Sequence, residues 1–289
     1  MTGVERIPVD FSGKAVLVTG GTSGIGLATG LAFGRCGANV YLTHRWGSAD
    51  EHQVRARFAA VGAPVPDIVE ADVSVEEDTH KLLDRVQTRH DRLEVFVSNV
   101  SFAQVTRSHL DLRRKGLARS IGYSAWPLVG YMQAVQRVFS RYPRYVVGMS
   151  SRGPDCFLPG YDLVAAAKTV MEVMCRHLTV ELHAEDIRIN IVRANPVDTA
   201  SLTATFGPDF VPFCRRYHGE DFFIREQEVG DAALALCSGM MDAIKGQVLV
   251  LDRGLSFADN VVRLFHHRER YGLTHDPDAC AISARKETP

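Results

Sequence analysis

Residues 15–26 read AVLVTGGTSGIG, and this stretch decides the fold. Its first five residues are apolar or β-branched and predict a buried strand, while residues 25–36 have the apolar spacing of a helix. A glycine-rich turn between strand and helix lets the backbone approach an anion and points free N–H groups at it. The sequence therefore predicts a cradle for the pyrophosphate of a dinucleotide. The predicted cradle consists of Gly20, Thr22, Ser23, Gly24, Ile25 and Gly26.

The rest of the chain repeats this alternation of strand and helix. Further β-branched and apolar runs predict strands at 39–43, 67–71, 93–98, 145–150, 187–192 and 247–252. Between them lie segments with helical spacing, for example 75–90 and 161–183. Strands joined by crossover helices form a parallel sheet that is covered on both faces. We therefore expect one α/β domain over residues 1–289, a Rossmann-type doubly wound sheet of seven parallel strands.

Composition excludes several classes of function. With 33 basic and 34 acidic residues the net charge is -1, which gives no reason to expect a nucleic-acid partner. Glu5 and Asp10 stand where a signal peptide would be apolar, and no run approaches the length of a membrane span. The six cysteines are too widely spread for a zinc site or a redox dithiol. We expect a cytoplasmic protein without a metal ion.

The end of the second predicted strand indicates which dinucleotide binds. An acidic residue there would bind the ribose 2′-hydroxyl of NAD, but the sequence reads Thr43, His44, Arg45. An arginine can pair with the additional 2′-phosphate of NADPH. Arg45 therefore favours NADPH, although it could also be an ordinary surface arginine.

Four short motifs, in this order and spacing, resemble those of the short-chain dehydrogenase/reductase family. They are the glycine turn, the pair Asp72 and Val73, SNVS at 98–101, and NPVDT at 195–199, and the match covers about residues 11–252. The resemblance implies that Asp72 and Val73 hold the adenine and that Asn99 braces the sheet beside the cofactor. It also implies that Pro196 and Thr199 belong to the cofactor site, with Thr199 at the nicotinamide end.

The predicted catalytic helix departs from the common pattern of that family. Ordinary members have a tyrosine four residues before the lysine, but Val164 holds that place before Lys168. Tyr161 stands seven residues before Lys168, and seven helical residues return to within about 20° of the same face. This spacing resembles the NADPH-dependent enoyl-acyl carrier protein reductases, a divergent branch of the family. The resemblance implies that Tyr161 donates to the substrate oxygen and that Lys168 holds the nicotinamide ribose, unless Tyr161 merely begins the helix.

Two serines complete the set of expected catalytic residues. Ser151 matches the serine of ordinary dehydrogenases when counted from the lysine. A single helix is expected over about 119–139, where ordinary members carry a proton-relay asparagine; Ser124 is the expected equivalent, as in the enoyl reductase branch. Pro127 makes that alignment uncertain because it disturbs the start of a helix.

These residues favour an enoyl reductase acting on a thioester of acyl carrier protein or coenzyme A. The alternative is a carbonyl reductase for 3-oxoacyl or polyketide ketones, in which Ser151 holds the ketone oxygen. The altered SNVS and the missing asparagine also leave open a non-catalytic regulatory protein that binds NADPH. The resemblance further implies a homodimer or homotetramer.

Two segments interrupt the alternation of strand and helix. The first, about residues 200–228, is expected to form the substrate loop, and its aromatic side chains could line an acyl pocket or simply pack. These aromatic residues are Phe206, Phe210, Phe213, Tyr217, Phe222 and Phe223. The second, the tail of about 260–289, has a basic cluster that could meet the phosphates of coenzyme A or a carrier protein, or could be a solvated tail. The cluster consists of Arg263, His266, His267, Arg268 and Arg270.

Overall fold

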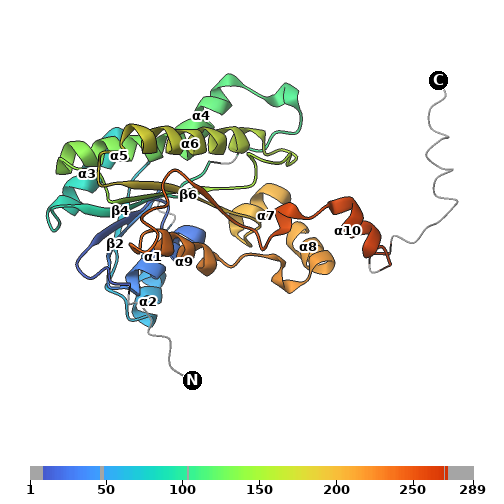
Figure 1. Ribbon diagram of the computed structural model, residues 1–289, viewed down its shortest axis with the longest axis horizontal. Helices are drawn as coiled ribbons and strands as arrows, with labels where there is room; N and C mark the ends of the chain where they lie inside the picture. Colours follow the sequence, from blue (N-terminus) through green and yellow to red (C-terminus); the bar gives the residue numbers. More distant parts are fainter. Residues whose placement is uncertain (1–8, 46–48, 103, 270, 273–289) are drawn as a thin grey trace.

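A single parallel sheet organises the molecule (Figure 1). The computed structural model describes residues 9–45, 49–102, 104–269 and 271–272. The strands are β1 (Ala15–Val18), β2 (Asn39–His44), β3 (Asp67–Glu70), β4 (Leu93–Ser98), β5 (Tyr145–Ser150), β6 (Arg188–Ala194) and β7 (Val248–Leu251). They lie in the order β3-β2-β1-β4-β5-β6-β7, and each neighbouring pair is parallel. The predicted doubly wound seven-stranded sheet is confirmed.

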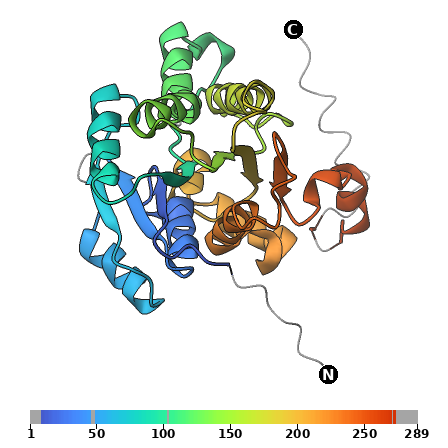
Figure 2. The same ribbon diagram turned by 60° about the vertical axis from the view of Figure 1, so that its left-hand side comes forward.

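Helices cover both faces of this sheet (Figure 2). They are α1 (Gly24–Gly34), α2 (Glu51–Ala60), α3 (Glu76–Gln87), α4 (Arg114–Ser124), α5 (Trp126–Phe139), α6 (Asp162–Glu181), α7 (Ala200–Phe206), α8 (Phe210–His218), α9 (Glu226–Leu236) and α10 (Asn260–His266). Short 3₁₀ turns are η1 (His109–Asp111), η2 (Glu220–Phe222) and η3 (Leu255–Phe257). No described helix is both long and apolar enough to cross a bilayer.

The alternation of side chains along β1 explains the two cores. Val16 and Val18 join the apolar cluster that contains residues of α1, α2 and α9. Leu17 points to the other face and joins the cluster built with α3, α5 and α6. Both faces of the strand are therefore buried, which is why its sequence reads as a continuous apolar run.

The chain changes direction across the sheet between β1 and β4. From β1 the strands proceed outward to β2 and β3, and from β4 they proceed the other way to β7. In such sheets the crevice for a ligand lies at the carboxyl ends of the two strands where the order reverses. The glycine turn follows β1 and Asn99 follows β4, so both lie at this crevice.

Two local predictions were wrong. The single helix expected over about 119–139 is two helices, because Pro127 lacks an N–H and lies in the first turn of α5, where that loss is tolerated. The segment of about 200–228, which was expected to be a loop, contains α7, α8 and the beginning of α9. Gly207 and Gly219, with φ of +90° and +89°, end α7 and α8 and so keep these helices short.

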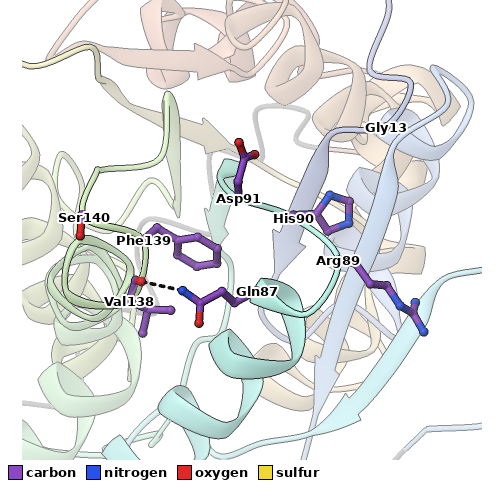
Figure 3. Close-up of a pocket in the computed structure, with 8 residues that line it drawn as sticks. All are labelled: Gly13, Gln87, Arg89, His90, Asp91, Val138, Phe139 and Ser140. Carbon is purple, nitrogen blue, oxygen red and sulfur yellow. Dashed lines mark hydrogen bonds between the residues drawn. The ribbon is translucent and has the colours of Figure 1, made fainter.

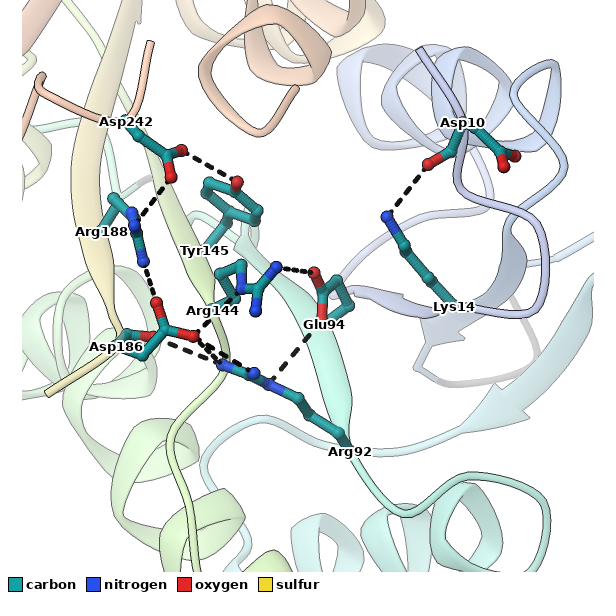
Figure 4. Close-up of polar contacts among 9 residues, drawn as sticks. All are labelled: Asp10, Lys14, Arg92, Glu94, Arg144, Tyr145, Asp186, Arg188 and Asp242. Carbon is teal, nitrogen blue, oxygen red and sulfur yellow. Dashed lines mark hydrogen bonds and ion pairs between the residues drawn. The ribbon is translucent and has the colours of Figure 1, made fainter. Parts of the chain in front are cut away.

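An ion-pair cluster ties together the amino ends of β4, β5 and β6 (Figure 4). The Asp186 carboxylate pairs with Arg92 at 3.4 Å and Arg144 at 3.1 Å, and also with Arg188. Glu94 lies 3.5 Å from Arg144 and 3.7 Å from Arg92. Each cation therefore has a carboxylate partner at this edge.

Candidate active site

Gly21 and Gly26 in the glycine turn have no room for a side chain. A Cβ atom on Gly26 would lie 2.2 Å from the carbonyl oxygen of Gly20, closer than any non-bonded contact allows. Gly20 and Gly24 have φ of +60° and +56°, the left-handed region that glycine enters without strain. Ser23 caps α1, but its side chain makes no capping hydrogen bond. The N–H groups at the start of α1 therefore face a close-packed cradle, as the sequence predicts for a pyrophosphate site.

Asn99 holds this turn in place. Its side-chain amide donates to the carbonyl oxygens of Thr19 and Gly20, both at 3.0 Å, and its backbone N–H donates to the Thr19 hydroxyl at 3.1 Å. These bonds join the end of β4 to the end of β1. The bracing role implied by the family resemblance agrees with this arrangement.

The side chains expected to hold the adenosine also hold one another. A guanidinium nitrogen of Arg45, just after β2, lies 2.8 Å from a carboxylate oxygen of Asp72, just after β3. Arg45 also donates to the Tyr123 hydroxyl, which donates to Asp72 at 3.2 Å. The Ser74 hydroxyl donates to the other Asp72 oxygen at 2.8 Å. The Val73 side chain, between Asp72 and Ser74 in the sequence, is buried. Tyr123 was not expected in this group, since nothing in the sequence places α4 beside β3.

Tyr161, Ser151 and Lys168 gather where β5 leads into α6. Tyr161 directly precedes α6, and its hydroxyl donates to the Ser151 hydroxyl oxygen at 3.0 Å. The Lys168 ammonium is buried and donates to the carbonyl oxygen of Met149 at 2.6 Å. Burial raises the pKa of Tyr161, and the hydrogen bond to Ser151 opposes this rise. Burial lowers the pKa of Lys168 to about 8, against the opposing charge of Glu172.

A buried ion pair beneath Lys168 was not anticipated. Glu172, one helical turn further along α6, accepts two hydrogen bonds from Arg193 of β6, at 2.5 and 3.1 Å. The Ser150 hydroxyl donates to the same carboxylate at 2.6 Å, and Arg193 also pairs with Asp155. An arginine inside the apolar strand INIVRA was the signal in the sequence, because a charge in a buried strand needs a partner.

The remaining predicted residues lie around this centre but bond elsewhere. Ser124 is buried, and its hydroxyl accepts from the Phe102 N–H at 2.9 Å and lies 3.4 Å from the Ser101 hydroxyl. The Thr199 hydroxyl caps α7 by accepting from the Leu202 N–H at 3.2 Å. The carbonyl oxygen of Pro196 accepts from the Ile224 N–H at 2.8 Å. The last contact fastens the segment before α9 to the end of β6.

Two aromatic side chains of residues 200–228 lead to Tyr161. The Phe206 ring stacks on Tyr161 with a centroid distance of 6.3 Å, and Phe210 stacks on Phe206 at 4.8 Å. Phe210 also packs, with Phe222, against the small apolar cluster of Val211, Cys214 and Phe223. This segment therefore combines a contact with the candidate catalytic tyrosine and local packing.

The structure also describes a broad pocket of about 740 Å³ away from these residues (Figure 3). Gly13 and Asp91 in its lining precede β1 and β4, so it lies at the amino edge of the sheet. Gln87 spans part of it by donating to the carbonyl oxygen of Val138 at 2.8 Å. Its place at the opposite edge separates it from the candidate active site.

The part of the chain that the structure describes contains neither a candidate metal cluster nor a disulfide. Within those residues, no group of three or more His, Cys, Asp or Glu side chains could hold a metal ion. The described cysteines, Cys36, Cys156, Cys175, Cys214 and Cys237, are all free. Cys280, Arg270 and the tail beyond residue 272 lie outside the described residues.

Comparison with known proteins identifies the family. The model of the family described as enoyl-(acyl carrier protein) reductase matches residues 20–256. The chain belongs to this family. As a member, it is an oxidoreductase of the short-chain dehydrogenase/reductase kind, and it uses a nicotinamide dinucleotide.

Individual relatives place the chain within this enoyl-(acyl carrier protein) reductase family. The enoyl-[acyl-carrier-protein] reductase [NADH] of Aquifex aeolicus is 26% identical over 250 residues, covering 84% of this chain and 92% of the relative. The 1-cyclohexenylcarbonyl-CoA reductase of Streptomyces collinus is 28% identical, covering 83% of this chain and 86% of the relative.

Solved structures support the same fold. The crystal structure of the Aquifex aeolicus enoyl-[acyl-carrier-protein] reductase (NADH) has a TM-score of 0.74 and 25% identity, covering 86% of this chain and 98% of that one. A 7α-hydroxysteroid dehydrogenase has a TM-score of 0.75 at 18% identity, covering 86% and 96%, and supports the fold alone.

Proposed function

We propose that the protein reduces the carbon–carbon double bond of an enoyl thioester and that NADPH is the hydride donor. The observation that carries the proposal is the position of Tyr161, which precedes α6 and lies seven residues before Lys168. The extra turn leaves more room between hydroxyl and ammonium, as a substrate that reacts at its β-carbon requires. The names of the Aquifex and Streptomyces relatives, both reductases of activated enoyl groups, support the same reaction.

The residues around Tyr161 can perform the steps of this reduction. When bound, the reduced nicotinamide supplies a hydride, which forms the new bond at the substrate β-carbon. The electron pair of the double bond then moves toward the thioester oxygen, and the Tyr161 hydroxyl donates a hydrogen bond to that oxygen. Such preorganised donors commonly contribute about 3 kcal/mol. The α-carbon finally takes a proton from the solvent side.

Lys168 supplies a positive charge that is held in place near Tyr161. Its ammonium is anchored by the Met149 carbonyl oxygen, and the carboxylate of Glu172 lies one helical turn away. In the proposed role the ammonium donates to the nicotinamide ribose and so orients the cofactor over Tyr161. Ser124 and Thr199 would support the loops on either side.

A carbonyl reductase is the second candidate. It is favoured by the 3.0 Å hydrogen bond between Tyr161 and Ser151, because two hydroxyls this close can both donate to one ketone oxygen. In that reaction Tyr161 would protonate the alkoxide that hydride addition creates.

The choice of NADPH depends on Arg45, because the Aquifex relative is named as an NADH enzyme. Arg45 stands at the end of β2, where the adenosine ribose is expected, and its side chain is about one-third exposed. We expect Arg45→Gln to raise the KM for NADPH about tenfold, since a charged hydrogen bond to the 2′-phosphate is lost, and to raise the KM for NADH less, through the lost ion pair with Asp72. Steady-state kinetics with both cofactors would measure this. An equal change for both would count against a role in binding the 2′-phosphate.

The reaction itself can be tested with the purified protein. We expect oxidation of NADPH with crotonyl thioesters of coenzyme A or acyl carrier protein, followed by the absorbance of the reduced nicotinamide. Activity confined to 3-oxobutanoyl thioesters would replace this proposal with the carbonyl reductase. Dinucleotide binding without turnover of either substrate would instead favour a regulatory protein.

We further propose a cytoplasmic homodimer or homotetramer whose Phe206 and Phe210 contact the acyl chain. The stacking of Phe206 on Tyr161 supports this placement of the acyl group. Light scattering of the purified protein would determine the number of subunits.

A further inference from the structure

A second pocket, of about 210 Å³, lies between α8, α10 and the turn after β7. Figure 1 draws α8 and α10 at the same end of the molecule, close to α7. The residues after α10 are joined to α8 by the Tyr271 hydroxyl, which donates to the carbonyl oxygen of Tyr217 at 3.0 Å. Neither the dinucleotide cradle nor the Tyr161 centre uses these residues.

The pocket is positively charged. Arg263 contacts the ring of His218, and within the described residues no carboxylate pairs with Arg263. Burial, and the charge of Arg263, lower the pKa of His218, which favours the neutral ring beside the charged guanidinium. Arg253 also lines the pocket, although Glu228 pairs with it at 2.9 Å. An anionic group would therefore find a cation here that no carboxylate of the described residues pairs with.

The same pocket offers aromatic surfaces. Tyr217, Tyr271 and Phe222 line it, and the rings of Tyr217 and Tyr271 meet edge to face at 5.2 Å. Phe222 stacks on His218 at 4.1 Å. Flat aromatic walls beside an arginine suit a planar base that carries phosphate groups, because the base can stack while the phosphate pairs.

Helix α8 connects the candidate active site to this pocket. Tyr161 stacks on Phe206, and Phe206 on Phe210 at the start of α8. Tyr217 lies seven residues after Phe210, on the same face of α8 and about 10 Å further along the helix axis. The pocket therefore lies about two turns of α8 from the aromatic rings that contact Tyr161, a separation that an extended pantetheine arm can span.

We infer that this pocket binds the 3′-phosphoadenosine of coenzyme A, and that the substrate is an acyl-CoA. The inference rests on the proposed reduction of an enoyl thioester. It adds a site that would bind coenzyme A and not an acyl carrier protein. A carrier protein presents its phosphopantetheine without an adenine, so the aromatic walls would have no ligand. Arg263 would pair with a phosphate, and Tyr217, Tyr271 or Phe222 would stack on the base.

Kinetics with two thioesters test this inference. We expect the kcat/KM of crotonyl-CoA to exceed that of crotonyl-pantetheine, which has the same acyl group without the nucleotide. Arg263→Gln should lower the value for crotonyl-CoA about tenfold and leave crotonyl-pantetheine unchanged. Arg216→Gln is the matched control, because Arg216 is an exposed arginine of α8 that does not line the pocket. Equal values for the two thioesters in the wild type would overturn the inference.

A binding measurement separates this inference from the proposed reaction. Adenosine 3′,5′-bisphosphate is titrated calorimetrically into protein saturated with NADP⁺, so that the cradle is already filled. Binding that weakens about tenfold in Arg263→Gln and not in Arg216→Gln supports the pocket even if neither thioester is reduced, a result that would overturn the proposed function alone. Equal binding by both variants, or an equal effect of Arg263→Gln on crotonyl-acyl carrier protein, overturns the coenzyme A site.

Discussion

The two edges of the sheet hold their charged groups in opposite ways. At the amino edge, the Asp186 carboxylate is surrounded by guanidinium groups, which outweigh the effect of burial and lower its pKa to about 2. At the carboxyl edge, Lys168 is buried, and burial lowers its pKa to about 8 because the nearby charge of Glu172 compensates only in part. Satisfied ion pairs hold the strands together, whereas an incompletely compensated charge can respond to a bound substrate or cofactor.

The broad pocket at the amino edge sharpens this contrast. It exceeds the pocket near α8 in volume, at about 740 against 210 Å³, yet none of the predicted site residues lines it. The residues expected to bind the cofactor or to act in catalysis lie instead at the carboxyl ends of β1, β4 and β5, where the sheet topology opens a crevice. The expected site and the larger cavity are therefore at opposite edges of the sheet.

Removing the tyrosine hydroxyl should produce the largest effect at the carboxyl edge. We expect Tyr161→Phe to lower kcat about 10²- to 10³-fold, the usual loss for one oxyanion donor, without changing the dinucleotide Kd. Enoyl reduction kinetics and fluorescence titration of the cofactor would measure the two quantities. Ser151→Ala, which removes the hydrogen-bond partner of Tyr161, should cost less if the substrate is an enoyl thioester. A larger loss from Ser151→Ala than from Tyr161→Phe would favour the carbonyl reductase.

Closing the cradle should produce the next largest effect. In Gly26→Ala the new methyl group would lie 2.2 Å from the Gly20 carbonyl oxygen, so the turn must shift. Overpacking of this kind commonly costs about 1–3 kcal/mol, so we expect the dinucleotide Kd to rise about tenfold or more and the Tm to fall. Gly122→Ala is the control, since a Cβ there would meet no atom within 4 Å. An unchanged dinucleotide Kd in Gly26→Ala would mean that the cradle is not the binding site.

Sequence patterns predicted the sheet well because its five inner strands, β2, β1, β4, β5 and β6, are buried on both faces. Such strands read as short apolar runs, and all seven expected runs are strands in the structure. The glycine turn was equally readable, since its positive φ angles and close packing require glycine itself. Requirements of this kind, for an apolar run or for a glycine, concern residues that are close together in the chain. They can therefore be recognised in a single sequence.

What the sequence did not reveal depends on contacts between distant segments. Glu172 meets Arg193 only because α6 packs on β6, and Arg45 meets Tyr123 only because α4 lies beside the end of β2. The break between α4 and α5 was also missed, although Pro127 signals a helix start. Partners of charged side chains are set by packing, so motif spacing could name Lys168 but not the ion pair beneath it.

The titration of Lys168 should appear in the pH profile. Because its pKa is lowered to about 8, the ammonium loses its proton as the pH rises above that value. We expect kcat/KM to fall above about pH 8, by up to tenfold per unit, if the charged form is required. Stability should change in the opposite sense, since the cost of burying the charge is present below about pH 8 and is relieved as the pH rises toward 10.5. Lys168→Arg, with a much higher pKa, should remove the fall, and a profile identical to the wild type would assign it to another group.

The smallest effect should come from the amino edge. We expect Asp186→Asn to lower the free energy of unfolding by about 1 kcal/mol and the Tm by a few degrees, because its half-exposed carboxylate is screened by water. Since the pKa of Asp186 is depressed, its contribution is present above pH 3.8 and is lost as the pH falls toward about 2, so wild type and variant should converge there. Urea unfolding at several pH values measures this difference. The kcat/KM should be unchanged at neutral pH, because the ion pairs lie at the far end of the strands from Tyr161; a reduced value would show that the two edges are coupled through β5.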